Sequence, residues 1–222
     1  MPPNTELQTQ PASIRRVSDA NSPEFESLLG IYIDSIVESE RKSIARLTAD
    51  FERSEYFFLV LVLADEIIGF SIVFVPENHE FALLEYMAIV KDHRNKGHGN
   101  ELFQKTIAYI YKIFGFLNVV LEVDSDREAS DDHGKRVKRL EFYRRQGCKL
   151  IQNLEYVLPL EASSPPPAMS LLILPASTHQ SIAKSTLRSW LTSMYSMVYG
   201  VSPDDPRINK MISSLNDLVQ IC

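Results

Sequence analysis

The sequence predicts an α/β fold with a central mixed, mostly antiparallel twisted sheet of about seven strands flanked by helices. Runs of β-branched and aromatic residues at 56–64, 67–75 and 81–90 are separated by short polar turns, as in an antiparallel meander. A strand–loop–helix–strand unit over 81–123 implies a parallel pair joined by a crossover helix. With 222 residues, 45% of them hydrophobic, the chain can form one well-filled domain.

Caps and periodicity predict the remaining elements. Ser22 is a typical N-cap with Pro23 at the first helical position, and apolar residues then recur at helical spacing over 25–36. Gly115 and Gly147 are placed to end two later helices. We expect further strands at 13–17, 119–123, 149–152, 156–160 and 169–174, and further helices at 43–52, 136–146, 187–198 and 204–219.

The chain divides by composition into three segments. Residues 1–12 are polar and proline-bearing and predict a disordered tail. Residues 13–174 hold all of the predicted strands and form one predicted domain. Residues 175–222 become helical in pattern and predict a C-terminal helical extension packed on the same domain.

Charge and composition exclude several classes of protein. The net charge of −6 disfavours non-specific binding to nucleic acid or an anionic membrane. Two cysteines are too few for a disulfide framework, and the five histidines show no metal-ligand spacing. The N-terminus lacks the features of a signal peptide, and no apolar run approaches the roughly 20 residues of a membrane span. We therefore expect a cytoplasmic protein without a metal.

One segment carries recognisable chemistry. Arg94, Gly97 and Gly99 form R-x-x-G-x-G between a strand and an amphipathic helix. Glycines let the backbone approach an anion closely, and the helix start supplies N–H groups and the positive end of the helix dipole. The pattern predicts a pyrophosphate cradle. It is not a dinucleotide fingerprint, because Leu102 stands where that motif needs a small residue, and 97–100 lacks the G-K-[ST] of a P-loop.

This segment resembles the coenzyme A-binding motif of the GNAT superfamily of acetyltransferases, R/Q-x-x-G-x-G/A after a strand. The order of predicted elements over 13–174 is similar to that family's, and 142–148, FYRRQGC, is similar to its Y-x-x-x-G-F ending of the next helix. The resemblance implies an N-acetyltransferase that moves an acetyl group from acetyl-CoA to a primary amine by direct attack.

The resemblance also implies roles for single residues. Glu85 is placed like the family's general base and Tyr143 like its general acid, while Glu122 on the next strand could assist at the substrate. The residues implied to hold acetyl-CoA are Ile89 and Val90 at the pantetheine arm, and Arg94, Asn95, Lys96, Gly97, His98, Gly99 and Asn100 at the pyrophosphate. Two departures stand out: Asn95 replaces a frequent glycine, and arginines occupy the family's N-x-x-A positions at 136 and 139.

Structural roles compete with these catalytic ones. Glu85 and Glu122 could be salt-bridged strand carboxylates, and Tyr143 could be a packing residue with a satisfied hydroxyl. The alternative functions are an acyltransferase with a longer donor or a hydroxyl acceptor, and a non-catalytic module that binds acyl-CoA. Retention of both Glu85 and Tyr143 favours the enzyme.

Acceptor choice is predicted to depend on the break at 37–42 and on the extension. Glu40 is suited to pair with an ammonium group and Arg41 with a carboxylate, which favours a small zwitterionic or polar amine over a basic protein tail. The extension carries an apolar stripe that includes Trp190 and Tyr199. This stripe could cover the acceptor cleft, form a homodimer with a second copy, or pack on the far side of the core.

Overall fold

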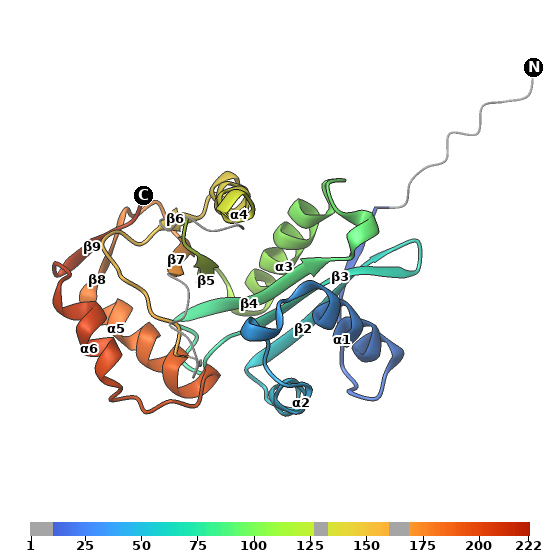
Figure 1. Cartoon of the computed structure of the whole chain (residues 1–222), viewed down its shortest axis with the longest axis horizontal. Coiled ribbons are helices and arrows are strands. Elements are labelled where there is room, and N and C mark those ends of the chain that lie inside the picture. Colours follow the sequence, from blue (N-terminus) through green and yellow to red (C-terminus); the bar gives the residue numbers. More distant parts are fainter. Residues whose placement is uncertain (1–10, 127–132, 160–168) are drawn as a thin grey trace, which may run out of the picture. The chain divides into compact units, whose positions relative to one another are not determined.

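The computed structural model describes residues 11–126, 133–159 and 169–222, apart from the side chain of Ser39. Seven strands form one sheet in the order β1-β2-β3-β4-β5-β7-β6 (Figure 1). Their bounds are Ser13–Arg16 (β1), Tyr56–Leu63 (β2), Glu66–Phe74 (β3), Phe81–Ile89 (β4), Asn118–Asp124 (β5), Lys149–Leu150 (β6) and Met169–Leu174 (β7). The pair β4–β5 is parallel, whereas β1–β2, β5–β7 and β6–β7 are antiparallel. The predicted mixed sheet is confirmed.

The helices flank this sheet and follow it. They are α1 (Pro23–Ser35), α2 (Ile44–Phe51), α3 (His98–Phe114), α4 (His133–Arg145), α5 (Lys184–Ser193) and α6 (Pro206–Ser213), with a π-helical turn, η3, at Met194–Val198. The caps lie where the sequence places them. Ser22 accepts a hydrogen bond from the N–H of Phe25, and Gly115 and Gly147 have φ angles of +78° and +89° just after α3 and α4. No helix in the described ranges is both long and apolar enough to cross a membrane.

The chain forms two compact units, and β4 contributes to both. The first unit is Met1–Ile72 with Tyr86–Ile113, and the second unit is Val73–Glu85 with Phe114–Cys222. Residues 1–10, which hold most of the predicted disordered tail, lie outside the described residues. The last residue of that predicted tail, Ala12, is buried among apolar side chains of the first unit.

The first unit packs helices on both faces of its strands. Neighbouring residues on a strand point to opposite faces. Accordingly, Phe70 of β3 meets the ring of Tyr32 in α1, at 6.0 Å, while Ser71 exchanges a 2.7 Å hydrogen bond with Thr106 in α3. The helices α1 and α2 therefore cover one face and α3 the other, as Figure 1 shows.

The second unit contains the C-terminal segment. Trp190 of α5 is 1% exposed and packs on Phe81 of β4, with ring centroids 5.6 Å apart. Beside this contact, the Ser189 hydroxyl donates to the Glu80 carboxylate at 3.0 Å. The extension thus buries its apolar stripe within the unit that holds β5 and β7.

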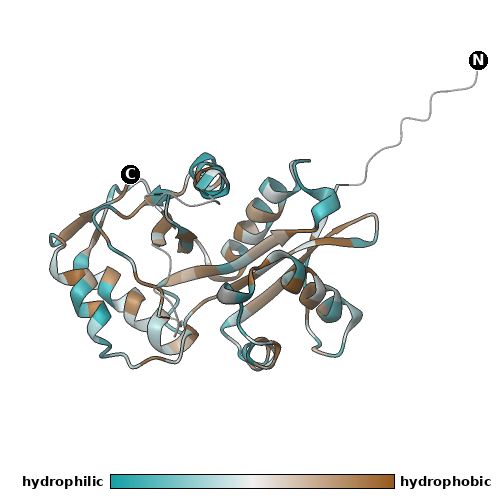
Figure 2. Ribbon diagram, in the orientation of Figure 1, coloured by the Kyte–Doolittle hydropathy of each residue, from teal (hydrophilic) through white to brown (hydrophobic). Residues whose placement is uncertain are grey.

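Figure 2 shows that hydrophobic residues dominate the strands, whereas α4 is mostly hydrophilic.

Two predicted elements are wrong in detail. Over its described residues, 156–159, the predicted strand at 156–160 makes a single bridge, at Tyr156, because the N–H of Val157 donates to the sulfur of Met211 instead of a strand. The predicted helix at 204–219 ends at Ser213. Its last residues form β9 (Leu218–Gln220), which pairs with β8 (Ser181–Ala183) in a separate two-stranded sheet that the sequence did not reveal.

Candidate active site

The predicted cradle lies in the first unit, between the end of β4 at Ile89 and the start of α3 at His98. A short 3-10 turn follows β4, and the loop after it has two residues in the left-handed region. Asn95 has a φ of +61° and Gly97 a φ of +88°. Glycine adopts this conformation without strain, and asparagine tolerates it better than most residues. The local backbone therefore explains both the motif's first glycine and the asparagine before it.

This loop leads directly into free helical N–H groups. The amides of His98, Gly99 and Asn100 lie in the first turn of α3, where no earlier helix carbonyl exists to accept from them. A Cβ built on Gly97 would meet nothing within 4 Å, so the space in front of the loop is open. Open space, aligned N–H groups and the positive end of a 17-residue helix fit a pyrophosphate.

Acidic and basic side chains around the cradle nearly balance. The rings of His93 and His98 lie 5.7 Å apart. His93 Nε2 is 3.8 Å from Glu66 Oε2, and His98 Nδ1 is 3.5 Å from Glu101 Oε2. The attraction for an anion therefore rests mainly on the backbone N–H groups, with the exposed Lys96 beside them.

Arg94 fixes the loop to the end of the strand. Its Nε donates to the carbonyl of Ile89 at 2.8 Å, and its Nη2 donates to the Ser35 hydroxyl at 3.0 Å. The N–H of Val90 donates to the carbonyl of Ile68 at 2.9 Å. The main-chain groups predicted to meet the pantetheine arm are thus already engaged within the unit. A carbonyl can accept a second hydrogen bond, so the carbonyl oxygens of Ile89 and Val90 are the groups suited to that arm.

Two carboxylates stand together in the second unit, where β4 and β5 stop pairing. The register of the parallel pair ends at Leu84 opposite Leu121, although both strands continue. The next residues are Glu85 and Glu122, and both are half-buried. Facing positions on adjacent strands point to the same side, so the two carboxylates share one face of the sheet.

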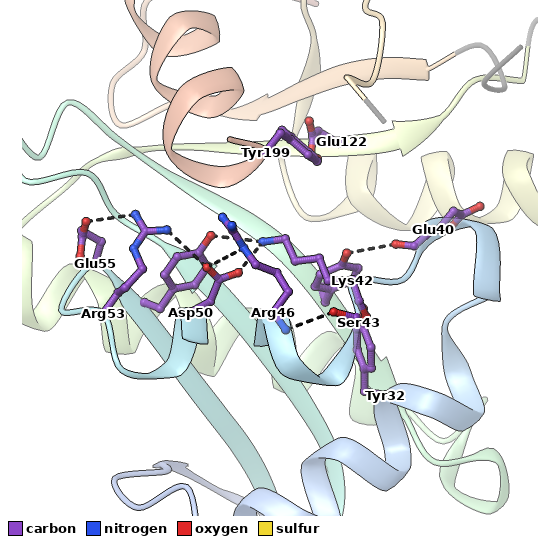
Figure 3. Close-up of polar contacts among 12 residues, drawn as sticks. Tyr32, Glu40, Lys42, Ser43, Arg46, Asp50, Arg53, Glu55, Glu122 and Tyr199 are labelled. Carbon is purple, nitrogen blue, oxygen red and sulfur yellow. Dashed lines mark hydrogen bonds and ion pairs between the residues drawn. The ribbon is translucent and has the colours of Figure 1, made fainter. Parts of the chain in front are cut away.

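Two tyrosine hydroxyls hold the Glu122 carboxylate. Tyr156 donates to Oε1, and Tyr199 donates to Oε2 at 2.5 Å. Figure 3 shows Tyr199 lying against Glu122. Burial, and after it the negative charges of Glu122 and more distantly of Glu85, hold the pKa of Tyr199 well above its usual range. The influence of both carboxylates on one hydroxyl brings Glu85, Glu122 and Tyr199 into a single cluster.

Tyr143 lies on α4, which an ion pair fastens to the end of β5. Arg139 Nη1 is 2.6 Å from the buried Asp124 carboxylate, and Tyr143 follows one turn later on the same side of the helix. Its ring packs on Phe142 with centroids 5.1 Å apart. Burial raises the pKa of Tyr143 to about 12, with a smaller opposing effect from Arg139. The phenol therefore stays protonated at neutral pH. Arg139, one of the two arginines that replace the family's N-x-x-A residues, holds α4 against the end of β5.

A family model for the acetyltransferase (GNAT) family matches residues 25–148, more than half of the chain. The chain belongs to the GNAT family. The resemblance inferred from the motif is thereby confirmed, and the protein is an acetyltransferase by family. The matched residues include the cradle, Glu85, Glu122 and Tyr143, whereas Tyr156 and Tyr199 lie beyond them.

Solved GNAT structures share this fold. A putative GNAT acetyltransferase from Bacteroides thetaiotaomicron has a TM-score of 0.68 at 20% identity, covering 86% of this chain and 99% of its own. The ribosomal-protein-S18-alanine N-acetyltransferase from Escherichia coli has a TM-score of 0.54 at 16% identity, covering 76% and 96%. Arabidopsis thaliana NAA60 in complex with acetyl-CoA has a TM-score of 0.53 at 14% identity, covering 73% and 97%. No curated protein matches the chain.

The segment predicted to choose the acceptor is held in place through its backbone, within the first unit. The hydroxyl of Tyr86 donates to the carbonyl of Glu40 at 3.0 Å, and its ring meets Tyr32 edge-on at 5.0 Å. Tyr32 in turn donates to the carbonyl of Lys42 at 3.3 Å. Arg41 Nη1 donates to the carbonyl of Ile33, near the end of α1. The Arg41 guanidinium thus has a structural partner, and Tyr86, which the sequence did not single out, is the residue that anchors Glu40.

A buried ion cluster supports the same segment. The Asp50 carboxylate is 1% exposed and lies 2.8 Å from Lys42 Nζ, whose side chain is 8% exposed. Arg46 and Arg53 approach the other oxygen at 3.2 and 3.3 Å. Figure 3 shows Lys42 reaching from the segment toward Asp50 of α2. Asp50 is therefore the anchor for three cations around the helix that follows the segment.

Valine at Gly97 is expected to remove coenzyme A binding while leaving the protein folded. The added side chain would fill the open space in front of the loop, where a pyrophosphate must approach, and would strain a backbone with φ of +88°. Calorimetry should show affinity reduced by at least about 100-fold, since several charge-assisted hydrogen bonds are lost together. Gly115→Val is the matched control. Gly115 also has a positive φ, of +78°, and open space where a Cβ would lie, but it follows the end of α3 instead of preceding its start. Full affinity in a folded Gly97→Val protein would refute the cradle.

Proposed function

We propose that this GNAT enzyme transfers the acetyl group of acetyl-CoA to a primary amine of a small molecule. The observation that carries the donor assignment is the left-handed loop at Gly97, open in front and followed by the first-turn amides of α3. Two relatives of the same fold support it: Arabidopsis thaliana NAA60 was solved with acetyl-CoA, and a Bacillus subtilis acetyltransferase with TM-score 0.51 was solved with CoA.

The donor would be held by backbone groups of the first unit. The N–H groups of 96–100 bind the pyrophosphate, and Arg94 keeps their loop against the strand end through its bond to Ile89. The carbonyls of Ile89 and Val90 accept from the amides of the pantetheine arm. Asn95 supplies the second left-handed residue that turns the loop toward the helix. When bound, acetyl-CoA supplies the thioester whose acetyl carbon the amine attacks.

Glu85 acts as the general base. An amine is protonated in neutral water and cannot attack until it loses a proton. A half-buried carboxylate with a second carboxylate at the adjacent strand position is suited to accept that proton. Glu85 therefore takes one proton from the ammonium group, and the lone pair of the neutral amine then forms the bond to the acetyl carbon.

Tyr143 acts as the general acid. Breaking the carbon–sulfur bond leaves a thiolate, which the phenol of Tyr143 protonates. The second proton that the nitrogen loses as it becomes an amide restores the phenol. Burial keeps this phenol neutral at neutral pH by raising its pKa to about 12. An acyl-cysteine route through Cys148 is disfavoured, because burial also raises the pKa of that thiol to about 12 and leaves little thiolate. Direct transfer to the amine is the remaining route that uses these side chains.

The substrate that receives the acetyl group is a small amine. It also carries a group that can donate or accept a hydrogen bond with the polar segment at 37–42. The carbonyl of Glu40 is fixed by Tyr86, so the carboxylate of Glu40 is presented from an ordered backbone. That carboxylate suits a positively charged group of the acceptor other than the amine that is acetylated, and Arg41, once released from Ile33, pairs with a carboxylate. These charges suit a zwitterionic or polar amine.

Release of free thiol from acetyl-CoA tests the proposal. The purified chain is incubated with acetyl-CoA and one of a panel of acceptors: amino acids, polyamines, aminoglycoside-type amines, peptides with free N-termini and lysine peptides. Thiol release that depends on a small amine supports the proposal. Release only with peptides would overturn the acceptor class, and absence of release with every amine would overturn the activity.

Phenylalanine at Tyr143 is expected to lower turnover by about 100-fold, the lower range for removal of a general acid, with little change in acetyl-CoA affinity. The ring contact with Phe142 is kept, so the free energy of unfolding should change by less than about 1 kcal/mol. Steady-state kinetics and chemical denaturation measure the two effects. A loss of stability that accounts for the loss of rate would assign Tyr143 to packing.

A further inference from the structure

Glu122, at the position that matches Glu85 on the neighbouring strand, is held by two tyrosine hydroxyls. Each of its carboxylate oxygens accepts a hydrogen bond from a different tyrosine, Tyr156 on Oε1 and Tyr199 on Oε2. Tyr156 follows β6, and Tyr199 comes from the C-terminal segment. Both tyrosines lie outside the residues that match the GNAT family model, whereas Glu122 lies within them.

The backbone before Tyr199 fixes the position of its hydroxyl. The helix that starts as α5 widens into the π-helical turn η3, and the N–H of Tyr199 reaches back to the carbonyl of Met194 at 3.3 Å. Met194 and Val198 are buried, and Tyr195 donates its hydroxyl to the carbonyl of Val157. A π-turn shifts the side chains that follow it relative to a regular helix, and such turns are frequent at functional sites. The π-helical turn and the buried residues around it thus place the Tyr199 hydroxyl beside the Glu122 carboxylate.

We propose that Tyr199, together with Tyr156, is a positioning residue that keeps Glu122 ionised and fixed, so that Glu122 binds the acceptor's ammonium group while Glu85 accepts its proton. The inference rests on the proposed function and deepens it. It assigns different tasks to two carboxylates that occupy matching positions on neighbouring strands.

The hydrogen bonds favour this division. A hydroxyl that donates to a carboxylate stabilises its charged form, and two such donors do so together. The donors keep their protons: burial, and then the charge of Glu122, holds the pKa of Tyr156 and of Tyr199 well above the usual range. Glu122 is therefore a poor proton acceptor.

Other charged groups near the cluster act more weakly. Arg207 lies 5.5 Å from the Tyr195 ring and is paired with Asp205 at 2.8 Å, so its charge is largely compensated. Tyr195 is close enough for the Glu122 charge to raise its pKa slightly, after the larger effect of burial. The ionised Glu122 in turn favours a proton on Glu85, because like charges at adjacent positions oppose each other. The fixed negative charge selects a cationic acceptor.

Tyr199→Phe tests the inference in two independent measurements. The first follows the carboxyl ¹³C signal of Glu122, assigned by its loss in Glu122→Gln, as pH falls in the protein without substrates. Removal of one donor should move its protonation to higher pH. The second is steady-state kinetics, in which the acceptor KM should rise about 10-fold while kcat changes less than about threefold, since a hydrogen bond to a charged group is worth about 1.5 kcal/mol. Acetyl-CoA affinity should not change.

Tyr195→Phe is the matched control. It removes a tyrosine hydroxyl from the same helix end, but one that donates to Val157 instead of Glu122. It should leave both the ¹³C titration and the acceptor KM unchanged. If Tyr199→Phe does not fold, Tyr156→Phe removes the donor to the other oxygen and must give the same two effects. An unchanged titration in a folded Tyr199→Phe or Tyr156→Phe protein would overturn the inference.

The two measurements also separate this inference from the proposed function. A shifted ¹³C titration without acetyl transfer to any amine would leave the positioning intact and remove the reaction. Acetyl transfer with an unshifted titration and an unchanged acceptor KM would keep the reaction and overturn the role of Tyr199.

Discussion

Replacing Glu85 with glutamine is expected to lower turnover at neutral pH by about 10²–10⁴-fold, the usual size for removal of a general base. Glutamine keeps the shape of the side chain and removes its ability to take a proton. Acetyl-CoA affinity should be retained, since the cradle lies at Gly97 and in the first turn of α3. The deficit should shrink as pH rises, because the acceptor amine then loses its proton without help.

Two variants serve as controls for this result. Glu80→Gln removes the same charge just before β4, from a carboxylate that accepts from Ser189, and should leave turnover unchanged. Glu122→Gln should raise the acceptor KM without reproducing the pH-dependent loss of turnover. If Glu85→Gln turns over at the parent's rate at neutral pH, the base is another group. If Glu122→Gln shows the pH-dependent loss instead, the two roles are reversed.

Replacing Asp50 with asparagine is expected to destabilise the protein by about 3–5 kcal/mol, because it leaves a buried cation without its partner. Lys42 is 8% exposed and points at Asp50 Oδ2, and its ammonium group also donates to the Tyr56 hydroxyl at 3.2 Å. Since Lys42 ends the segment predicted to choose the acceptor, acceptor KM should rise as well. Chemical denaturation and acceptor kinetics measure the two effects.

Arg46→Gln is the matched control for Asp50. It removes another partner of the same carboxylate, but one that is 42% exposed and can be solvated. Exposed ion pairs contribute less than about 1 kcal/mol, so the free energy of unfolding should fall by no more than that. Equal effects of Asp50→Asn and Arg46→Gln would mean that the buried Lys42–Asp50 pair contributes no more to the free energy of unfolding than the exposed contact of Arg46.

Local signals in the sequence were sufficient for most of the fold. Ser22 and Gly115 mark helix ends through backbone conformations that depend on one or two residues, so they could be located without the structure. The left-handed φ of Gly97 and the helix start behind it, on which the predicted cradle depends, are local features as well. Glu85 was placed as the candidate base through the family resemblance, and its role stays a prediction.

The rest depends on contacts between distant residues. Tyr199 is 77 residues from Glu122, and nothing in the local sequence indicates that a π-turn directs its hydroxyl there. In the sequence, Asp50 is an ordinary polar residue on a short predicted helix. Its buried ion pair with Lys42 is visible only in the structure. The strand β9 was predicted as helix because Leu218–Gln220 is short, and its partner β8 lies more than thirty residues earlier.

The measurement that tests the central claim most directly is the stoichiometry of the reaction. The parent protein is incubated with acetyl-CoA and the best small amine, and the free thiol released is compared with the acetylated amine identified by mass spectrometry. Direct transfer predicts one acetylated amine for each thiol, and a folded Gly97→Val protein should yield neither. Thiol release without an acetylated amine, or acetylation that persists undiminished in Gly97→Val, would contradict the account.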